Sequence, residues 1–248
     1  QANLARNIVE VLYPNDNHYS GKELRLKQQY FFVSASVQRA ILKFKENNAD
    51  IHDLPNKVTF QLNDTHPTVT VAELMRILVD EENLEWDDAW DITCRTCAYT
   101  NHTILAEALE KWPRHYLAEV VPQLVPIIEI LDDKVRRRFS DESVAIIDRN
   151  DLVHMAHIDI HYGMSVNGVA KLHTEILENT ELNNFYRIYP EKFNNKTNGI
   201  TFRRWLIHCN NGLAKYIETL IGSEYRHDAE KLKDLLKFAG DKNVYDNL

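Results

Sequence analysis

The sequence predicts a helix-rich α/β fold on the basis of a pattern that occurs twice. Val58–Leu62 alternates apolar and polar residues like a half-buried strand, and Cys97–Thr100 also has the composition of a short strand. Each segment is followed by a polar loop that contains a histidine, and then by a stretch in which a helix is expected. Strands that alternate with helices are typical of an α/β sheet, and long helical stretches elsewhere predict much helix around it.

The first half of the chain predicts helix, loop, helix and then the first strand. Apolar residues recur at helical spacing in residues 1–13 and 22–47, and Pro14–Gly21 between them has the composition of a loop. In residues 22–47 they cover more than one face, which predicts a helix buried on several sides. After the strand, Thr70 and Glu73 have the spacing of a capping box, so a helix is expected to start there.

The second half predicts further helices and one more strand. Leu152–Ile160 is expected to be a strand, and residues 185–197 are expected to be irregular. Pro122 and Pro126 fall inside an expected helix, where they predict a break. Residues 163–179 are expected to begin with a glycine-containing loop and to continue as a helix. Further helices are expected at residues 86–94, 104–112, 116–138, 201–208, 212–221 and 229–238.

Composition limits the class of protein. The chain has 248 residues, 44% of them hydrophobic and 27% charged, which fits one large or two modest soluble domains. A net charge of -8 argues against nucleic-acid binding through a basic field. No apolar run approaches a membrane span, no signal peptide opens the chain, and three cysteines make no disulfide framework. We therefore expect a cytoplasmic protein without nucleic-acid or membrane partners.

The most informative stretch is the polar loop after the first strand. Asn63–Pro67 holds a carboxylate, Asp64, and an imidazole, His66, at the carboxyl end of a strand, where α/β sheets usually bind ligands. Taken alone, however, this loop is better explained as an ordinary Asx-type turn with a capping role. Together with Asn101–Thr103 and Asn194–Gly199, it supplies neutral amides, hydroxyls and imidazoles, which suit hydrogen bonding to sugar hydroxyls.

Two other groupings have weaker functional interpretations. Cys94 and Cys97 have the spacing of a redox or zinc pair, but two buried thiols at a helix–strand junction explain them better. His157, Asp159 and His161 would lie on one face of a strand and could bind a transition metal. A metal hydrolase built on these three residues is therefore an alternative, although a metal site is not the favoured interpretation.

The order of several motifs resembles a known enzyme family. Tyr-Pro-Asn-Asp-Asn at 13–17, Leu-Asn-Asp-Thr-His-Pro at 62–67 and Ala-Tyr-Thr-Asn-His-Thr at 98–103 are followed by Val-Asn-Gly-Val-Ala-Lys at 166–171 and Asn-Lys-Thr-Asn-Gly-Ile-Thr at 195–201. In this collinear order they resemble the α-glucan phosphorylases, which act on glycogen, starch or maltodextrin, over essentially the whole chain. The resemblance implies a Rossmann-like mixed sheet with surrounding helices, within a two-domain glycosyltransferase-B-type enzyme.

The resemblance also implies a domain division and an activity. Residues 1–197 match the second half of the phosphorylase N-terminal domain, and residues 198–248 match the start of the C-terminal cofactor domain. The family cleaves terminal α-1,4-glucosidic bonds with inorganic phosphate, giving glucose 1-phosphate with retention, and works as a homodimer with pyridoxal phosphate. Neither the cofactor lysine nor the phosphate-binding segment matches any part of this chain, so we expect a fragment that is inactive alone. The alternative is a non-catalytic glucan-binding or structural module.

Residue by residue, the resemblance implies a site. His102 matches the histidine that contacts the glucose at the cleaved bond, and its main-chain carbonyl would favour positive charge in the transition state. Asp64 matches the aspartate that orients this histidine. The remaining matches contact the glucan, line its pocket or gate it: Tyr13, Asp16, Asn17, His66, Val169 and Asn198. No cofactor-binding or metal-binding residue is implied.

This chain departs from the family pattern at a few positions. Phe202 and Ala106 replace prolines, and Gly163-Met164-Ser165 stands where a different triplet is frequent. Asp159 occupies a position that is usually apolar or cysteine, which further weakens the metal interpretation. None of these changes removes a residue to which the resemblance assigns catalysis.

Overall fold

The structure, a computed structural model, describes residues 2–47 and 50–248. The chain divides into two compact units between Thr197 and Asn198, and each unit is considered by itself. Gln1, the first residue of the expected N-terminal helix, lies outside the described residues.

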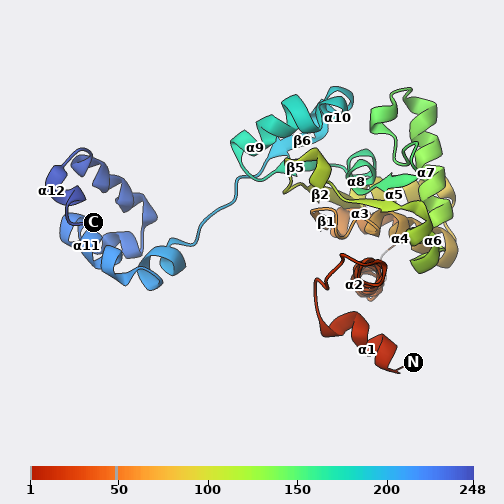
Figure 1. The fold of residues 1–248 in the computed structure, drawn as a ribbon, viewed down its shortest axis with the longest axis horizontal. Helices are drawn as coiled ribbons and strands as arrows, with labels where there is room; N and C mark the ends of the chain where they lie inside the picture. The colour runs from red at the N-terminus through yellow and green to blue at the C-terminus, as the bar shows by residue number, and fades with distance from the viewer. Residues whose placement is uncertain (1, 48–49) are drawn as a thin grey trace. The chain divides into compact units, whose positions relative to one another are not determined.

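The first unit is built on a four-stranded sheet in the order β1-β2-β5-β6 (Figure 1). All neighbouring strands in it are parallel, with Asn63 paired to Thr100 and Thr100 paired to Asn167. The expected mixed sheet is therefore wrong, because the antiparallel pair β3–β4 forms a separate two-stranded sheet. Parallel pairing follows from the helices that connect successive strands of the main sheet. The strands are β1 (Phe60–Asn63), β2 (Cys97–Thr100), β3 (Lys111–Pro113), β4 (Leu152–His154), β5 (Val166–Gly168) and β6 (Phe193–Asn195).

Helices surround this sheet, as the sequence predicts. Short 3-10 turns lie between several of them, and α4 and α9 each continue into a π-helical turn, Ile77–Glu81 and Leu177–Glu181. The helices of the first unit are α1 (Ala2–Glu10), α2 (Tyr19–Lys45), α3 (Leu54–Lys57), α4 (Thr70–Arg76), α5 (Trp86–Thr96), α6 (Arg114–Val120), α7 (Val125–Arg138), α8 (Met155–Tyr162), α9 (Lys171–Ile176) and α10 (Asn183–Ile188).

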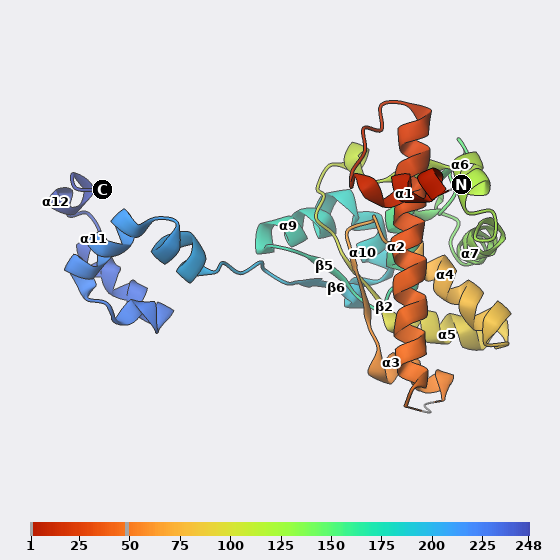
Figure 2. The same ribbon diagram turned by 90° about the horizontal axis from the view of Figure 1, so that it is seen from below.

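The long helix α2 packs against α4 and α6 with one face (Figure 2). Its buried apolar residues are spaced three, four or seven positions apart, which places them on one side of the helix: Leu26, Val33, Val37, Ile41 and Phe44. Phe31 and Phe32 point away from this face and are 46% and 49% exposed. The expectation of burial on several sides is therefore wrong for this structure, because α2 lies over the surface of the unit as an amphipathic helix.

Two further predictions concern helix ends. The break at the prolines is confirmed, since α6 ends at Val120 and Pro126 lies in the first turn of α7, where a missing N–H costs nothing. The capping box is wrong, because Val69 precedes the helix and makes no side-chain cap. Glu73 is instead fully buried and accepts hydrogen bonds from Arg76 and Ser34.

Three stretches differ from the expected secondary structure, and long-range pairing explains the differences. Residues 104–112 contain a 3-10 turn and then β3, whose Trp112 pairs with Val153 of β4. The expected strand Leu152–Ile160 stops at His154, and α8 follows, buried around nearly its whole circumference. A helix buried on all sides carries no 3.6-residue pattern and can imitate a strand. Residues 185–197 are not irregular but contain part of α10, a 3-10 turn and β6.

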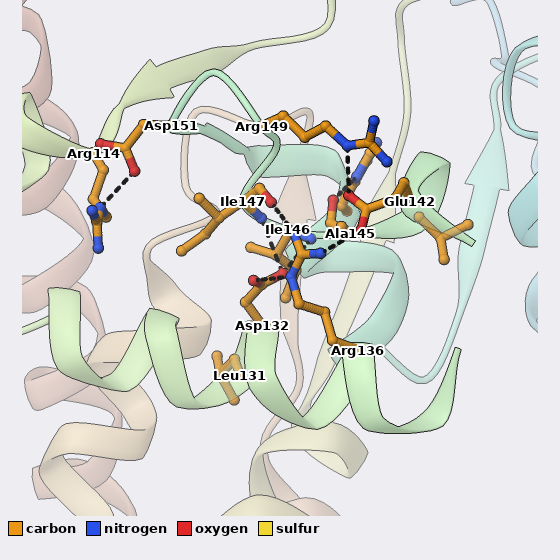
Figure 3. A network of polar contacts seen from close by, with 12 residues as sticks. Arg114, Leu131, Asp132, Arg136, Glu142, Ala145, Ile146, Ile147, Arg149 and Asp151 are labelled. Carbon is orange, nitrogen blue, oxygen red and sulfur yellow. Dashed lines mark hydrogen bonds and ion pairs between the residues drawn. The ribbon is translucent and has the colours of Figure 1, made fainter. Parts of the chain in front are cut away.

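A polar network fastens the loop after α7 to that helix (Figure 3). Asp132 accepts hydrogen bonds from the backbone N–H groups of Ile146 at 2.8 Å and Ile147 at 3.1 Å. Its other oxygen accepts from the Arg136 guanidinium at 2.7 Å, and Arg136 also pairs with Glu142 at 2.9 Å. One buried carboxylate therefore fixes the chain that leads into β4.

The second unit, Asn198–Leu248, is entirely helical or irregular. Tyr225 is fully buried and donates its hydroxyl to the Ala214 carbonyl at 3.0 Å, which ties the following segment to α11. In the described residues, no helix is both long enough and apolar enough to span a membrane. The helical segments of the second unit are a π-helical stretch (Arg203–His208), α11 (Asn211–Ile221), 3-10 helices (Glu224–Arg226, Ala229–Phe238) and α12 (Lys242–Tyr245).

Candidate active site at the carboxyl edge of the sheet

Polar side chains gather where the parallel strands end. Gln61 of β1 donates to the Thr100 hydroxyl at 2.8 Å, and this hydroxyl donates to the Asn167 amide oxygen at 2.8 Å. Because the strands are parallel, their carboxyl ends meet at one edge, as the sequence predicts for a ligand site. A row of neutral hydrogen-bonding groups thus crosses β1, β2 and β5.

His102 lies just beyond the end of β2 and is exposed. Its Nε2 is 2.6 Å from the Asn63 amide oxygen, at the end of β1. The preceding residue, Asn101, is fully buried and holds the backbone in place with three hydrogen bonds. Its amide donates to the Tyr99 hydroxyl at 2.9 Å, its side-chain oxygen accepts from Thr103 N–H, and its own N–H donates to the Asn167 carbonyl.

Asp64 is the turn residue after β1. Its φ of +62° is left-handed, a conformation that aspartate and asparagine tolerate better than most residues. Its N–H donates to the Thr100 carbonyl at 2.9 Å, and its carboxylate accepts from Thr65 N–H at 2.8 Å. Among the described residues, therefore, the carboxylate of Asp64 bonds to the turn itself, whereas the imidazole of His102 bonds to Asn63.

His66 and Tyr13 come together beside α2. Their rings meet edge to face with centroids 6.0 Å apart, and both line a hollow. The Nε of Arg25 and the Oε1 of Gln29 are buried and have no hydrogen-bond partner among the described residues. The residues that line the hollow are Leu12, Tyr13, Arg25, Gln28, Gln29, Phe32, Val33, His66 and Pro67.

The loop that carries Asp16 and Asn17 is fixed at the N-terminal side of α2. Asp16 forms an ion pair with Arg25 at 2.7 Å, and Asn17 N–H donates to the Asn15 side chain at 3.0 Å. A side chain at Gly21 would lie 1.9 Å from the Asn15 carbonyl oxygen, so only glycine allows this close approach. Asp16 is thereby joined to the same hollow as Tyr13 and His66.

Glu110 is a site residue that the sequence reasoning missed. Its carboxylate accepts from the Gln29 amide at 2.8 Å, from the Trp112 indole at 2.8 Å and from the Thr65 hydroxyl at 3.0 Å. It therefore holds the Thr65–His66 turn against α2. The expectation of a helix over residues 104–112 concealed this role, because the pairing of β3 with β4 decides where the carboxylate points.

Val169 directly follows β5, and His173 lies in the next helix, α9. Val169 N–H donates to His173 Nδ1 at 3.0 Å, so the ring carries its proton on Nε2, which is buried and without a partner among the described residues. Burial lowers the pKa of His173, and the charge of a protonated His102 lowers it further. Asn198, the remaining predicted residue, is exposed in the second unit.

The proposed metal triad is not assembled. Since residues 157–161 are helical and not extended, Asp159 points away from the two histidines. Asp159 accepts from the Thr68 hydroxyl at 2.6 Å, whereas His157 bonds to the Ala145 carbonyl and His161 to the Val144 carbonyl. In residues 2–47 and 50–248, no cluster of three or more potential ligands could hold a metal ion.

Cys94 and Cys97 are free thiols at the junction of α5 and β2. Burial raises the pKa of Cys94 to about 11 and that of Cys97 further still. A thiol with so high a pKa is a poor nucleophile and a poor metal ligand at neutral pH. This agrees with the structural interpretation of the pair.

The fold and the edge define a helix-rich α/β protein with a neutral, hydrogen-bonding site. The profile of the carbohydrate phosphorylase family matches residues 1–248, and the chain belongs to that family. It is 52% identical over 238 residues to maltodextrin phosphorylase of Streptococcus pneumoniae, covering 96% of this chain and 32% of that protein. It is 47% identical over 259 residues to the muscle glycogen phosphorylases of Homo sapiens and Oryctolagus cuniculus, covering 97% of this chain and 31% of theirs. The chain thus spans about a third of the length of these curated relatives.

Proposed function

We propose that this chain is the part of an α-glucan phosphorylase that binds the glucosyl unit at the cleaved bond. The full enzyme would cleave terminal α-1,4-glucosidic bonds of glycogen, starch or maltodextrin with inorganic phosphate, releasing glucose 1-phosphate with retention. The observation that carries this proposal is the row of neutral groups beside His102, in a chain that matches the family over its whole length. Sugar hydroxyls both donate and accept hydrogen bonds, and amides and neutral imidazoles can serve both needs.

Each site residue has a proposed role. His102 would contact the glucose, and its main-chain carbonyl would stabilise the positive charge that develops at the anomeric carbon. Asp64 would act on His102 through the turn that it shapes at the end of β1. Tyr13, His66, Val169 and Asn198 would contact the glucan or line its pocket, and Asp16 and Asn17 would gate it.

Pyridoxal phosphate is proposed as the cofactor of the full enzyme, held by residues outside this chain. The residues present do not fit it. Lys192 is largely buried, and burial lowers the pKa of its amine as a Schiff-base lysine requires. Its amine, however, donates to the carbonyls of Ile160 at 2.9 Å and His161 at 3.0 Å and caps α8. No step of the proposed chemistry is therefore assigned to a cofactor bound here.

The wider context follows from the same proposal. Residues 1–197 would be the second half of the N-terminal domain and residues 198–248 the start of the C-terminal domain, in a two-domain glycosyltransferase-B-type fold. The full enzyme would be a cytoplasmic homodimer, with glucan and inorganic phosphate as its ligands.

The decisive experiment measures glucose 1-phosphate release by a phosphorylase of full family length that carries this segment. With maltoheptaose and inorganic phosphate, we expect turnover that His102→Ala lowers by at least about a hundredfold. Glucan binding without any glucose 1-phosphate would favour the non-catalytic binding module instead. If His102→Ala leaves the turnover unchanged, His102 does not belong to the active site.

A further inference from the structure

The hydrogen bond between His102 and Asn63 carries a further inference, which rests on the proposed function. We propose that Asn63 is the positioning residue of His102. Its amide oxygen accepts the Nε2–H of the imidazole at 2.6 Å and so places the proton on Nε2. The other ring nitrogen, Nδ1, then keeps its lone pair and accepts a hydrogen bond from a glucose hydroxyl.

Asn63 and His102 both extend from backbone that hydrogen bonds hold in place, and this fixes the geometry of their contact. Asn63 is the last residue of β1 and is paired with Thr100 in the sheet ladder. The next N–H, of Asp64, continues the pairing by donating to the Thr100 carbonyl. On the other side, the hydrogen bonds of buried Asn101 fix the backbone immediately before His102. Two side chains that start from adjacent strand ends therefore meet without a flexible loop between them.

The chemistry of the partner is as important as its position. An amide oxygen accepts an N–H without supplying negative charge, whereas a carboxylate favours the charged imidazolium. The contrast is visible elsewhere in this chain, where the Asp50 carboxylate at 2.8 Å raises the pKa of His52. A neutral partner suits a histidine that must accept a hydrogen bond from a sugar hydroxyl, since an imidazolium has no lone pair to offer.

This assignment also separates Asn63 from its neighbour. The Asp64 carboxylate accepts from Thr65 N–H, so it shapes the turn, whereas Asn63 contacts the imidazole directly. Gln61 provides a matched control for the spectra of the imidazole, because it is a second amide on the same strand and bonds to the Thr100 hydroxyl instead of His102.

The first test determines which ring nitrogen of His102 carries the proton. In this chain labelled with ¹⁵N-histidine, long-range ¹H–¹⁵N spectra at a pH where His102 is neutral should show the Nε2–H form in the wild type. Asn63→Ala should convert it into a mixture of the two neutral forms, whereas Gln61→Ala and Asn63→Asp, which keeps an oxygen at the same place, should preserve the Nε2–H form. An Nδ1–H form in the wild type, or spectra of Asn63→Ala that match the wild type, would overturn the proposal.

The second test uses the phosphorylase of full family length. Loss of a residue that orients a catalytic group typically costs ten- to a hundredfold, so Asn63→Ala should lower kcat by about that factor with little change in the KM for glucan. Asn56→Ala, which removes an exposed amide of α3 that bonds to Asp53 outside the row, should stay within about threefold of the wild type. Equal effects of the two variants would refute a specific role for Asn63. If the wild-type enzyme forms no glucose 1-phosphate, the proposed function fails, while the spectra still decide the Asn63 contact.

Discussion

Replacing Asp132 with alanine tests whether one buried carboxylate holds the segment between α7 and β4. Asp132 is 6% exposed and accepts three hydrogen bonds, two of them from backbone N–H groups. Asp132→Ala leaves the N–H of Ile146 without a partner in a place that water does not reach, since Ile146 is fully buried. Ile147 is only partly buried and Arg136 is exposed, so the N–H of Ile147 and the guanidinium of Arg136 can turn to solvent.

The expected loss follows from this difference in exposure. A buried donor left unsatisfied costs about 1–3 kcal/mol, and the two partly exposed interactions add about 1 kcal/mol together. We therefore expect Asp132→Ala to lower the free energy of unfolding by roughly 2–4 kcal/mol. In a unit of this size the loss corresponds to a fall in Tm of roughly 4–16 °C.

Equilibrium urea unfolding of the chain, followed by far-UV circular dichroism, measures the loss, and hydrogen exchange of the Ile146 amide locates it. Asp133→Ala is the matched control, because Asp133 is the exposed neighbour on the same helix and should change stability by less than about 0.5 kcal/mol. Asp132→Asn keeps an oxygen for the two N–H groups and should lose less than Asp132→Ala. If Asp132→Ala is as stable as Asp133→Ala and still protects the Ile146 amide, the network in Figure 3 does not hold this segment.

Three further predictions concern the site and its surroundings. In the full enzyme, Asp64→Ala should lower kcat ten- to a hundredfold, because this variant loses the acceptor for Thr65 N–H and destabilises the left-handed turn, whereas Asp64→Asn should keep most of the activity. The double variant Asp64→Ala/His102→Ala should lose little more activity than His102→Ala alone. Full additivity of the two losses would show that the two residues act independently. Burial raises the pKa of Asp159 well above its ordinary value, so the folded state holds this proton more tightly than the unfolded state. The contribution of Asp159 to stability should therefore fall as pH rises above about 4, the ordinary pKa of an aspartate, and Asp159→Asn should reduce this dependence in urea unfolding. Equal pH dependence of the unfolding free energy in the two proteins would contradict this prediction. The 248-residue chain alone should form no glucose 1-phosphate and no borohydride-trapped pyridoxyl adduct on any one lysine, and either product would refute this.

The carboxyl edge could be predicted because it depends on local pattern and on one general property of parallel sheets. Alternation identified β1, and a histidine after each of the first two strands marked the loops that follow. Once the strands are parallel neighbours, Asn63 and Thr100 must end side by side, and the two loops must meet. The direction of individual side chains could not be predicted, because it depends on the left-handed φ of Asp64.

The errors arose where tertiary burial overrides local pattern. The alternating residues of His157–His161 fit a strand, but α8 is buried on nearly every side and its sequence shows no helical stripe. Glu110 was missed for a related reason. Its role depends on the pairing of Trp112 with Val153, about forty residues away, and local spacing carries no information about such a pair.

The acidic groups near the edge bear on the proposal that this part of the chain contributes hydrogen bonds to a sugar. Glu110 is occupied by three donors, Asp16 by Arg25 and Asp64 by its own turn. Burial raises the pKa of Asp159, and its carboxyl group accepts a hydrogen bond from the Thr68 hydroxyl at 2.6 Å. In the described residues, then, each of these four carboxyl groups is bound by other groups of the fold. Retaining hydrolases place a pair of carboxyl groups across the bond that they cleave. An edge whose carboxyl groups are already engaged suits a reaction in which phosphate supplies the acid and base, and this supports the proposal that His102 and its amide neighbours bind and orient the sugar.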